Sequence, residues 1–112
     1  MPAPRIKLCG LTDPAALDAA IAARADYAAF NFYPPSPRFL PLDRAAELGV
    51  QAAGRIGRVG VFVDADDAAI AAAVSAAQLD AIQLHGSESP ARAAELRSRF
   101  GLPVWRVIGV AK

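Results

Sequence analysis

The chain has 112 residues, 54% of them hydrophobic, and a formal net charge of +1. This length allows one domain at most, and the hydrophobic fraction indicates a globular core. The near balance of charge argues against a nucleic-acid partner, which would select a basic excess or stripe. Polar residues interrupt the alanine-rich stretches, so we expect no membrane span and no membrane partner.

The location of the protein is predicted from its first ten residues and from its single cysteine. Residues 1–10 lack the apolar core of a signal peptide. One cysteine cannot form an internal disulfide, which suits a reducing compartment. Both features predict a cytoplasmic protein.

The first predicted elements are a strand and a helix. A short apolar run over residues 5–9 predicts the strand. Thr12 or Asp13 then caps a helix that has Pro14 at its first position, which is a standard helix start. We expect this helix to end near Arg24.

Three more strand–helix units and a final strand follow. Strands are expected over residues 27–32, 58–63, 81–85 and 104–108. Helices are expected over residues 42–53, from the acidic run 64–67 to about residue 78, and from the cap at residue 89 to residue 100. The connection over residues 33–41 contains four prolines and is therefore expected to be an extended, stiff loop.

The fold class follows from the alternation of five strands with four helices. Such a chain forms a parallel sheet with right-handed crossovers. Two arrangements are possible. One is an open doubly wound sheet, and the other is part of an eight-stranded (β/α)₈ barrel.

The two faces of the strands favour the barrel. Each of four strands pairs an aliphatic face with a face that carries polar groups. The polar-bearing faces hold Lys7 with Cys9, Gly60 with Phe62 and Asp64, Gln83 with His85, and Arg106. A doubly wound sheet needs two apolar faces, whereas a barrel covers one face with helices and turns the other inward. The alternative is that these polar groups lie at strand edges and reach out to solvent.

Cys9 is the first candidate for chemistry. It ends the first predicted strand, and alternation places it on the same face as Lys7. A cation two residues from a thiol on one face favours the thiolate. The structural alternative is a buried small hydrophobic residue, which is a common role of free cysteine.

Four segments resemble one family, phosphoribosylanthranilate isomerase, whose members are (β/α)₈ barrel enzymes of tryptophan biosynthesis. In chain order the segments read KLCGLT at 7–12, ADYAAFNFYPPSPR at 25–38, VGVFVD at 59–64, and QLHG at 83–86 followed by Glu88. The chain departs from the family pattern at Arg24, Ala29 and Asn31. The resemblance implies that residues 1–112 are the N-terminal part of a single barrel domain, a partial barrel whose last three strands have no counterpart here.

The resemblance also implies an activity. The family carries out an Amadori rearrangement of N-(5-phosphoribosyl)anthranilate to 1-(2-carboxyphenylamino)-1-deoxyribulose 5-phosphate. This isomerisation needs an acid at the ring oxygen and a base at carbon 2 of the sugar. It requires no redox cofactor and no metal, so the expected partner is a small-molecule substrate.

By the same resemblance, Cys9 is the general base and Arg38 binds the anthranilate carboxylate, a role that suits a guanidinium. Lys7 and His85 are further substrate-binding candidates. The alternatives are a solvated surface arginine at 38 and a structural histidine at 85. Asp64 and Arg106 are candidates for the rim or interior only, and starting a helix is the favoured role of Asp64.

The family's general acid is an aspartate on the sixth strand, and its phosphate is held mainly after the seventh and eighth strands. The 112 residues contain neither part, so we expect the chain alone to be inactive or nearly so. Two open sheet edges and an uncovered inward face would favour self-association. The competing hypotheses are a non-catalytic half-barrel for binding or assembly and a different sugar-phosphate barrel enzyme. Reading the coding DNA past Lys112 would separate the N-terminal part of an isomerase from the non-catalytic half-barrel.

Overall fold

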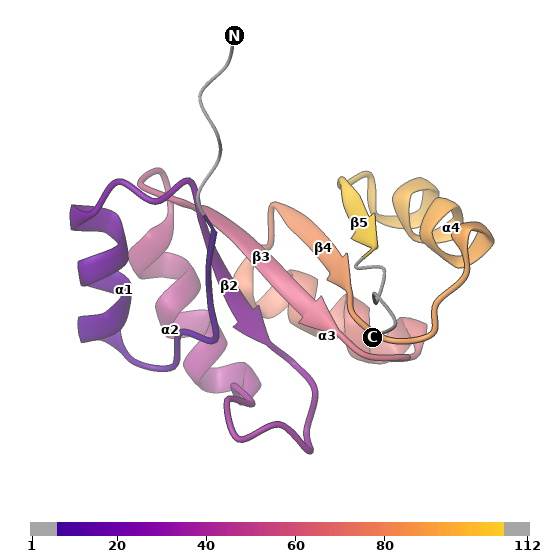
Figure 1. Ribbon diagram of the computed structural model, residues 1–112, viewed down its shortest axis with the longest axis horizontal. Helices are drawn as coiled ribbons and strands as arrows, with labels where there is room; N and C mark the ends of the chain where they lie inside the picture. Colours follow the sequence, from indigo (N-terminus) through magenta and orange to yellow (C-terminus); the bar gives the residue numbers. More distant parts are fainter. Residues whose placement is uncertain (1–6, 107–112) are drawn as a thin grey trace, which may run out of the picture.

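The structure is a computed structural model that describes residues 7–106, apart from the side chain of Cys9. Strands and helices alternate throughout this part of the chain (Figure 1). The elements are β1 Lys7–Cys9, α1 Pro14–Ala22, β2 Tyr27–Asn31, α2 Leu42–Ala52, β3 Gly57–Phe62, α3 Asp67–Ala77, β4 Ala81–Leu84, α4 Pro90–Phe100 and β5 Val104–Arg106. The predicted alternation is confirmed. Residues 5, 6, 107 and 108 of the predicted strands lie outside the described residues.

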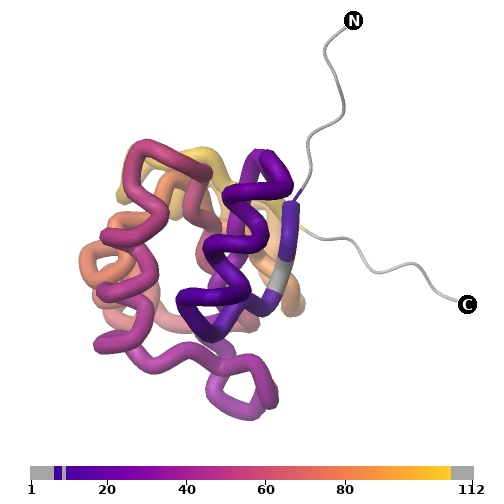
Figure 2. The backbone as a smooth tube through the Cα atoms, turned by 90° about the vertical axis from the view of Figure 1, so that its left-hand side faces the viewer, coloured from indigo at the N-terminus to yellow at the C-terminus, as the bar shows by residue number. Residues whose placement is uncertain are grey.

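The strands form one parallel sheet in the order β1-β2-β3-β4-β5. A doubly wound sheet reverses its strand order at a switch point, and no such reversal occurs among these strands. Right-handed crossovers that always progress in one direction place every helix on the same face of the sheet. Figure 2 shows α1 and α2 side by side on one side of β1. This arrangement confirms the predicted partial barrel.

The helix starts follow from short polar side chains. Asp13 caps α1 through a 2.8 Å hydrogen bond from the backbone N–H of Ala16, and Pro14 occupies the first turn. Ser89 caps α4 in the same way. The cap of α3 is Asp66, so the prediction that Asp64 starts this helix is wrong. Asp64 instead has a left-handed φ of 49° in the loop before the cap.

The main core lies between the helices and the convex face of the sheet. Each helix contributes a fully buried aliphatic side chain to it, and these are Leu17, Leu48, Ile70 and Leu96. They pack with strand residues such as Phe30 and Ile82. This main core therefore covers only one face of the sheet.

Among residues 7–106, no helix is long and apolar enough to cross a membrane.

A second, smaller cluster fills the concave face, which we define by Lys7, Tyr27, Ala29, Val59, Val61, Ala81, Gln83 and Trp105. The Lys7 ammonium of β1 donates a hydrogen bond to Oε1 of Gln83 in β4. The rings of Tyr27 in β2 and Trp105 in β5 meet edge to face, with their centroids 5.3 Å apart. Each pair joins strands that have two other strands between them. Such contacts require a strongly curved sheet, as in a barrel wall.

Three sequence predictions about this face are wrong. The aliphatic residues Val59 and Val61 of β3 face the concave side, whereas Phe62 packs under the helices. In β5 the inward residue is Trp105, and Arg106 follows it at the rim. The inward face was also expected to be uncovered, but Ala29, Val59 and Ala81 are at most 2% exposed. The curvature explains this burial because it brings side chains of distant strands together.

An ion-pair network joins α3 to α4 on the outer surface. One Asp67 oxygen lies 2.6 Å from Nη1 of Arg92, and the other lies 3.3 Å from Nη1 of Arg99. Arg92 also pairs with Glu95. The hydrogen bond to Asp67 is the main cause that raises the pKa of Arg92. These contacts hold α4 against α3 and lie away from the concave face.

Candidate active site

The carboxyl-terminal ends of the strands share one edge of the sheet, since all five run in the same direction. The connections at this edge carry Arg38, Asp64, His85 and Glu88. In barrel enzymes this rim holds the active site. The candidate site therefore comprises the end of β1 and the loops that follow β2, β3 and β4.

Cys9 is the last residue of β1. Its Cα pairs with Ala29 of β2, and the next backbone N–H, from Gly10, donates to the Ala29 carbonyl at 3.0 Å. Cys9 therefore stands at the rim end of a regular ladder, where it was predicted. Its side chain lies outside the part that the structure describes, so its predicted role as the base stays a prediction.

Lys7 lies one layer deeper than Cys9, because its Cα pairs with Tyr27. Its ammonium group is held by the side chain of Gln83, which is only 4% exposed. The sequence predicted Gln83 to lie on a polar face, but Gln83 was not predicted to be a site residue. A buried amide that accepts a hydrogen bond from an ammonium group fixes that charge within the concave face.

The proline-rich loop that carries Arg38 is closed on itself by hydrogen bonds. The backbone N–H of Leu40 donates to the Asn31 carbonyl at 2.8 Å, so the loop returns to the strand that it left. Asn31 Oδ1 accepts from the N–H of Tyr33 at 2.8 Å, and Ser36 Oγ accepts from the N–H of Arg38 at 3.1 Å. These side chains order the loop as Asx and Ser turns do. Asn31 and Ser36 were not predicted to support Arg38.

The side chain of Arg38 lies directly over Gly10. A Cβ atom at Gly10 would lie 2.4 Å from Cδ of Arg38 and 3.2 Å from its Nε. Gly10 also has a φ of 72°, a conformation that favours glycine. The structure thus brings Arg38 to the residue that follows Cys9, which places two of the predicted site residues at one point of the rim.

Gly10→Ala is expected to displace Arg38 as well as to strain the turn after β1. The added methyl group would overlap the stem of Arg38, which is exposed and can shift at little cost, and the left-handed backbone costs an alanine roughly 1–2 kcal/mol. We expect a lower melting temperature in thermal unfolding and a changed Nε–H resonance of Arg38 in NMR spectra. Gly54→Ala is the matched control, because φ is 74° there but nothing lies within 4 Å of the added atom. An unchanged Arg38 resonance in Gly10→Ala would contradict the contact.

His85 directly follows β4, and its side chain is exposed. Its backbone N–H donates to the Phe62 carbonyl at 2.8 Å. Among the described residues, no side chain forms a hydrogen bond with its imidazole. Arg106, the other rim candidate, donates from Nε to the Glu88 carbonyl at 3.1 Å. The structure thus places His85 on the rim but does not bring it into contact with Arg38 or Lys7.

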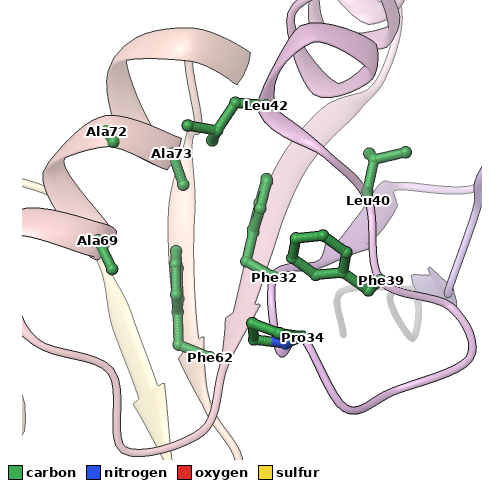
Figure 3. Close-up of a pocket in the computed structure, with 9 residues that line it drawn as sticks. All are labelled: Phe32, Pro34, Phe39, Leu40, Leu42, Phe62, Ala69, Ala72 and Ala73. Carbon is green, nitrogen blue, oxygen red and sulfur yellow. The ribbon is translucent and has the colours of Figure 1, made fainter.

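Neither of two cavities is lined by Lys7, Arg38 or His85. Figure 3 shows an apolar pocket of about 200 Å³ lined by Phe32, Pro34, Phe39, Leu40, Leu42, Phe62, Ala69, Ala72 and Ala73. It has no charged side chain and lies on the helix side of the sheet. A wider depression beside Arg58 and Asp80 lies at the opposite ends of the strands. Within residues 7–106, no group of three or more His, Cys, Asp or Glu residues is placed to hold a metal ion.

Comparisons with known proteins point to one family. The model of the N-(5'-phosphoribosyl)anthranilate isomerase family matches residues 6–112. A relative of that name from Paracoccus denitrificans is 50% identical over 106 residues, which are 95% of this chain and 49% of the relative. The chain spans about half the length of the curated relatives that it matches.

Solved structures show the same fold. The phosphoribosylanthranilate isomerase of Thermotoga maritima matches with a TM-score of 0.86 and 33% identity, over 98% of this chain and 53% of that one. A structure of phosphoribosylanthranilate isomerase in complex with reduced 1-(o-carboxyphenylamino)-1-deoxyribulose 5-phosphate also matches with a TM-score of 0.86. Its identity is 33%, over 98% of this chain and 56% of that one. A family match over nearly the whole chain, on a sheet with the same curvature, settles the assignment: this chain belongs to the N-(5'-phosphoribosyl)anthranilate isomerase family.

Proposed function

We propose that this chain supplies the base and the carboxylate-binding part of a phosphoribosylanthranilate isomerase site, acting in tryptophan biosynthesis in the cytoplasm. The observation that carries the proposal is the position of Arg38, whose side chain lies over Gly10 beside the end of β1. In a chain of this family, that contact joins the residue proposed to bind the anthranilate carboxylate to the residue that follows the proposed base.

The proposed reaction conserves all atoms. A general acid from the rest of the barrel protonates the ring oxygen as the ribosylamine ring opens to an iminium ion, and Cys9 as thiolate then removes the proton from carbon 2 of the sugar. Carbon 1 of the resulting enolamine takes that proton back from the thiol while the enol hydroxyl returns its proton to the acid, which gives the aminoketone. Arg38 is exposed and carried by an ordered loop, so it can pair with a carboxylate at low entropic cost. Lys7, fixed by Gln83, supplies positive charge one layer below the rim end of β1, and His85 is available at the rim end of β4.

The acid and the phosphate-binding groups of the family have no counterpart among the 112 residues. We therefore propose that residues 1–112 act as the first five strands of a single barrel domain. Losing a general acid costs about 10²–10⁴-fold in rate. The chain alone should consequently show little or no isomerase activity.

The test is a chimeric barrel, in which residues 1–112 are joined to the unmatched C-terminal part of the Paracoccus denitrificans relative. We expect the chimeric barrel to isomerise N-(5-phosphoribosyl)anthranilate and the 112-residue chain to be inactive or nearly so. A folded chimeric barrel without activity would contradict the proposed function. That result would favour the non-catalytic half-barrel instead.

Self-association is also part of the proposal. The sheet ends at β1 and β5, so each of these strands has one edge without a neighbour among the described strands. Unpaired parallel edges offer backbone N–H and C=O groups to other chains. We expect the sedimentation coefficient of the 112-residue chain to rise with concentration, and the chimeric barrel to show a weaker rise. A chain that stays monomeric at all concentrations would contradict this prediction.

A further inference from the structure

Two carboxylates join the loops that follow β3 and β4. Glu88 accepts hydrogen bonds from the backbone N–H of Asp64, at 2.7 Å on Oε2, and from that of Gly86, at 2.8 Å on Oε1. In return, Asp64 Oδ1 accepts from the N–H of Ser87 at 2.9 Å. We call this set of contacts the carboxylate bridge. It satisfies three backbone amides with two side chains from different loops.

The backbone on both sides is shaped to fit this bridge. Asp64 adopts a left-handed φ of 49°, which aspartate tolerates better than most residues. Gly86 lies so close to Asp64 that an added Cβ would sit 2.9 Å from the carboxylate carbon. A third strand joins through Arg106, whose Nε donates to the Glu88 carbonyl. The bridge and this additional bond together connect the loops after β3 and β4 with the end of β5.

Helix capping does not account for Glu88. The cap of α4 is Ser89, whose Oγ accepts from the N–H of Arg92 at 3.0 Å. Both oxygens of Glu88 instead bond amides outside the helix. The half-buried Glu88 side chain is thus placed for the loops and not for the helix start.

We propose that Glu88 is a positioning residue that holds His85 in place at the mouth of the barrel. His85 is fixed on one side by its own N–H bond to the Phe62 carbonyl. On the other side, the next two residues, Gly86 and Ser87, are both held by the bridge. The effect of this positioning on catalysis rests on the proposed function, whereas the hydrogen bonds of the bridge do not.

The bridge is tested on the 112-residue chain by amide hydrogen exchange followed by NMR. Glu88→Ala should lower the protection of the Asp64 and Gly86 amides by about tenfold or more, since both lose a charged acceptor. Glu88→Gln retains one carbonyl oxygen, so we expect only one of the two amides to keep its protection. Asp64→Gly should release the Ser87 amide. Unchanged protection at residues 64 and 86 in Glu88→Ala would overturn the bridge.

The positioning role needs a separate measurement. In Glu88→Ala, the backbone order parameters of residues 85–87 should fall from the rigid value of about 0.85 toward 0.6 or below. Glu95→Ala is the matched control, because it removes a carboxylate from α4, the helix that follows Glu88, but none from the bridge. Unchanged order at residues 85–87 in Glu88→Ala would overturn the positioning of His85.

The catalytic consequence is measured in the chimeric barrel. We expect Glu88→Ala to lower kcat/KM by about ten- to a hundredfold, which is the scale for a displaced site group. Glu95→Ala should leave it unchanged, and Glu88→Gln should fall between the two. Equal kcat/KM in Glu88→Ala and the unmodified barrel would overturn the catalytic part. An inactive unmodified barrel would overturn the proposed function, while the exchange pattern would still decide the bridge.

Discussion

Cys9→Ser in the chimeric barrel should lower kcat by about 10²–10⁴-fold, the range for loss of a general base. A serine hydroxyl has nearly the size of the thiol but does not ionise near neutral pH. The substitution therefore removes the base and leaves the ladder between β1 and β2 intact. Steady-state kinetics with saturating substrate measures this loss directly.

Cys9 is the only cysteine in the chain, which allows a second measurement. Alkylation of the 112-residue chain by iodoacetamide reports on this thiol alone. In a chimeric barrel whose C-terminal part lacks other cysteines, alkylation should abolish activity, and bound product analogue should slow it. Near-normal turnover of a folded Cys9→Ser barrel would exclude Cys9 as the base.

Arg38→Ala should raise the KM of the chimeric barrel by about ten- to a hundredfold. This range corresponds to the loss of a charge-assisted hydrogen bond, worth about 1.5–3 kcal/mol. Arg38→Lys keeps the charge but loses the planar fork that matches a carboxylate. Its KM should therefore lie between that of the unmodified barrel and that of Arg38→Ala. Initial rates over a wide range of substrate concentration separate KM from kcat.

Arg55→Ala is the control for this experiment. Arg55 is exposed and lines the depression at the opposite ends of the strands, so its loss removes one positive charge far from the rim. We expect its KM to match that of the unmodified barrel. An unchanged KM in Arg38→Ala would count against carboxylate binding, and an equal rise in both variants would indicate a general charge effect.

The order of elements could be predicted from the sequence because its local signals are strong. Pro14 and Pro90 each occupy the first turn of a helix, and Gly101 ends α4 with a left-handed φ of 65°. Such residues determine helix ends almost independently of tertiary structure. The strand ends were placed less well. Phe32, for example, follows β2 instead of ending it.

The faces of the strands were harder to predict. Alternation shows which residues share a face, but it does not show which face turns inward. In β4 the polar Gln83 lies inside, whereas in β3 it is the aliphatic Val59 and Val61 that do so. The choice depends on partners across the sheet, such as the pairing of Tyr27 with Trp105, and these partners come from distant parts of the chain.

The site was predicted from single residues at strand ends, and its supporting contacts were not. Arg38 could be named from its loop, but nothing local indicated that it would lie over Gly10. Similarly, the sequence indicates only that Glu88 precedes a helix cap. Its partner Asp64 lies 24 residues away in the chain. Contacts between loops depend on the register of β3 with β4, which the sequence alone leaves open.

The most direct test is the crystal structure of the chimeric barrel with reduced 1-(o-carboxyphenylamino)-1-deoxyribulose 5-phosphate, the compound bound in the matching isomerase complex. We predict that its carboxylate lies about 2.7–2.9 Å from the guanidinium nitrogens of Arg38, as in charge-assisted pairs. The sulfur of Cys9 should face carbon 2 of the sugar from the end of β1. A ligand whose carboxylate is bound elsewhere, with Cys9 turned under the helices, would contradict the account.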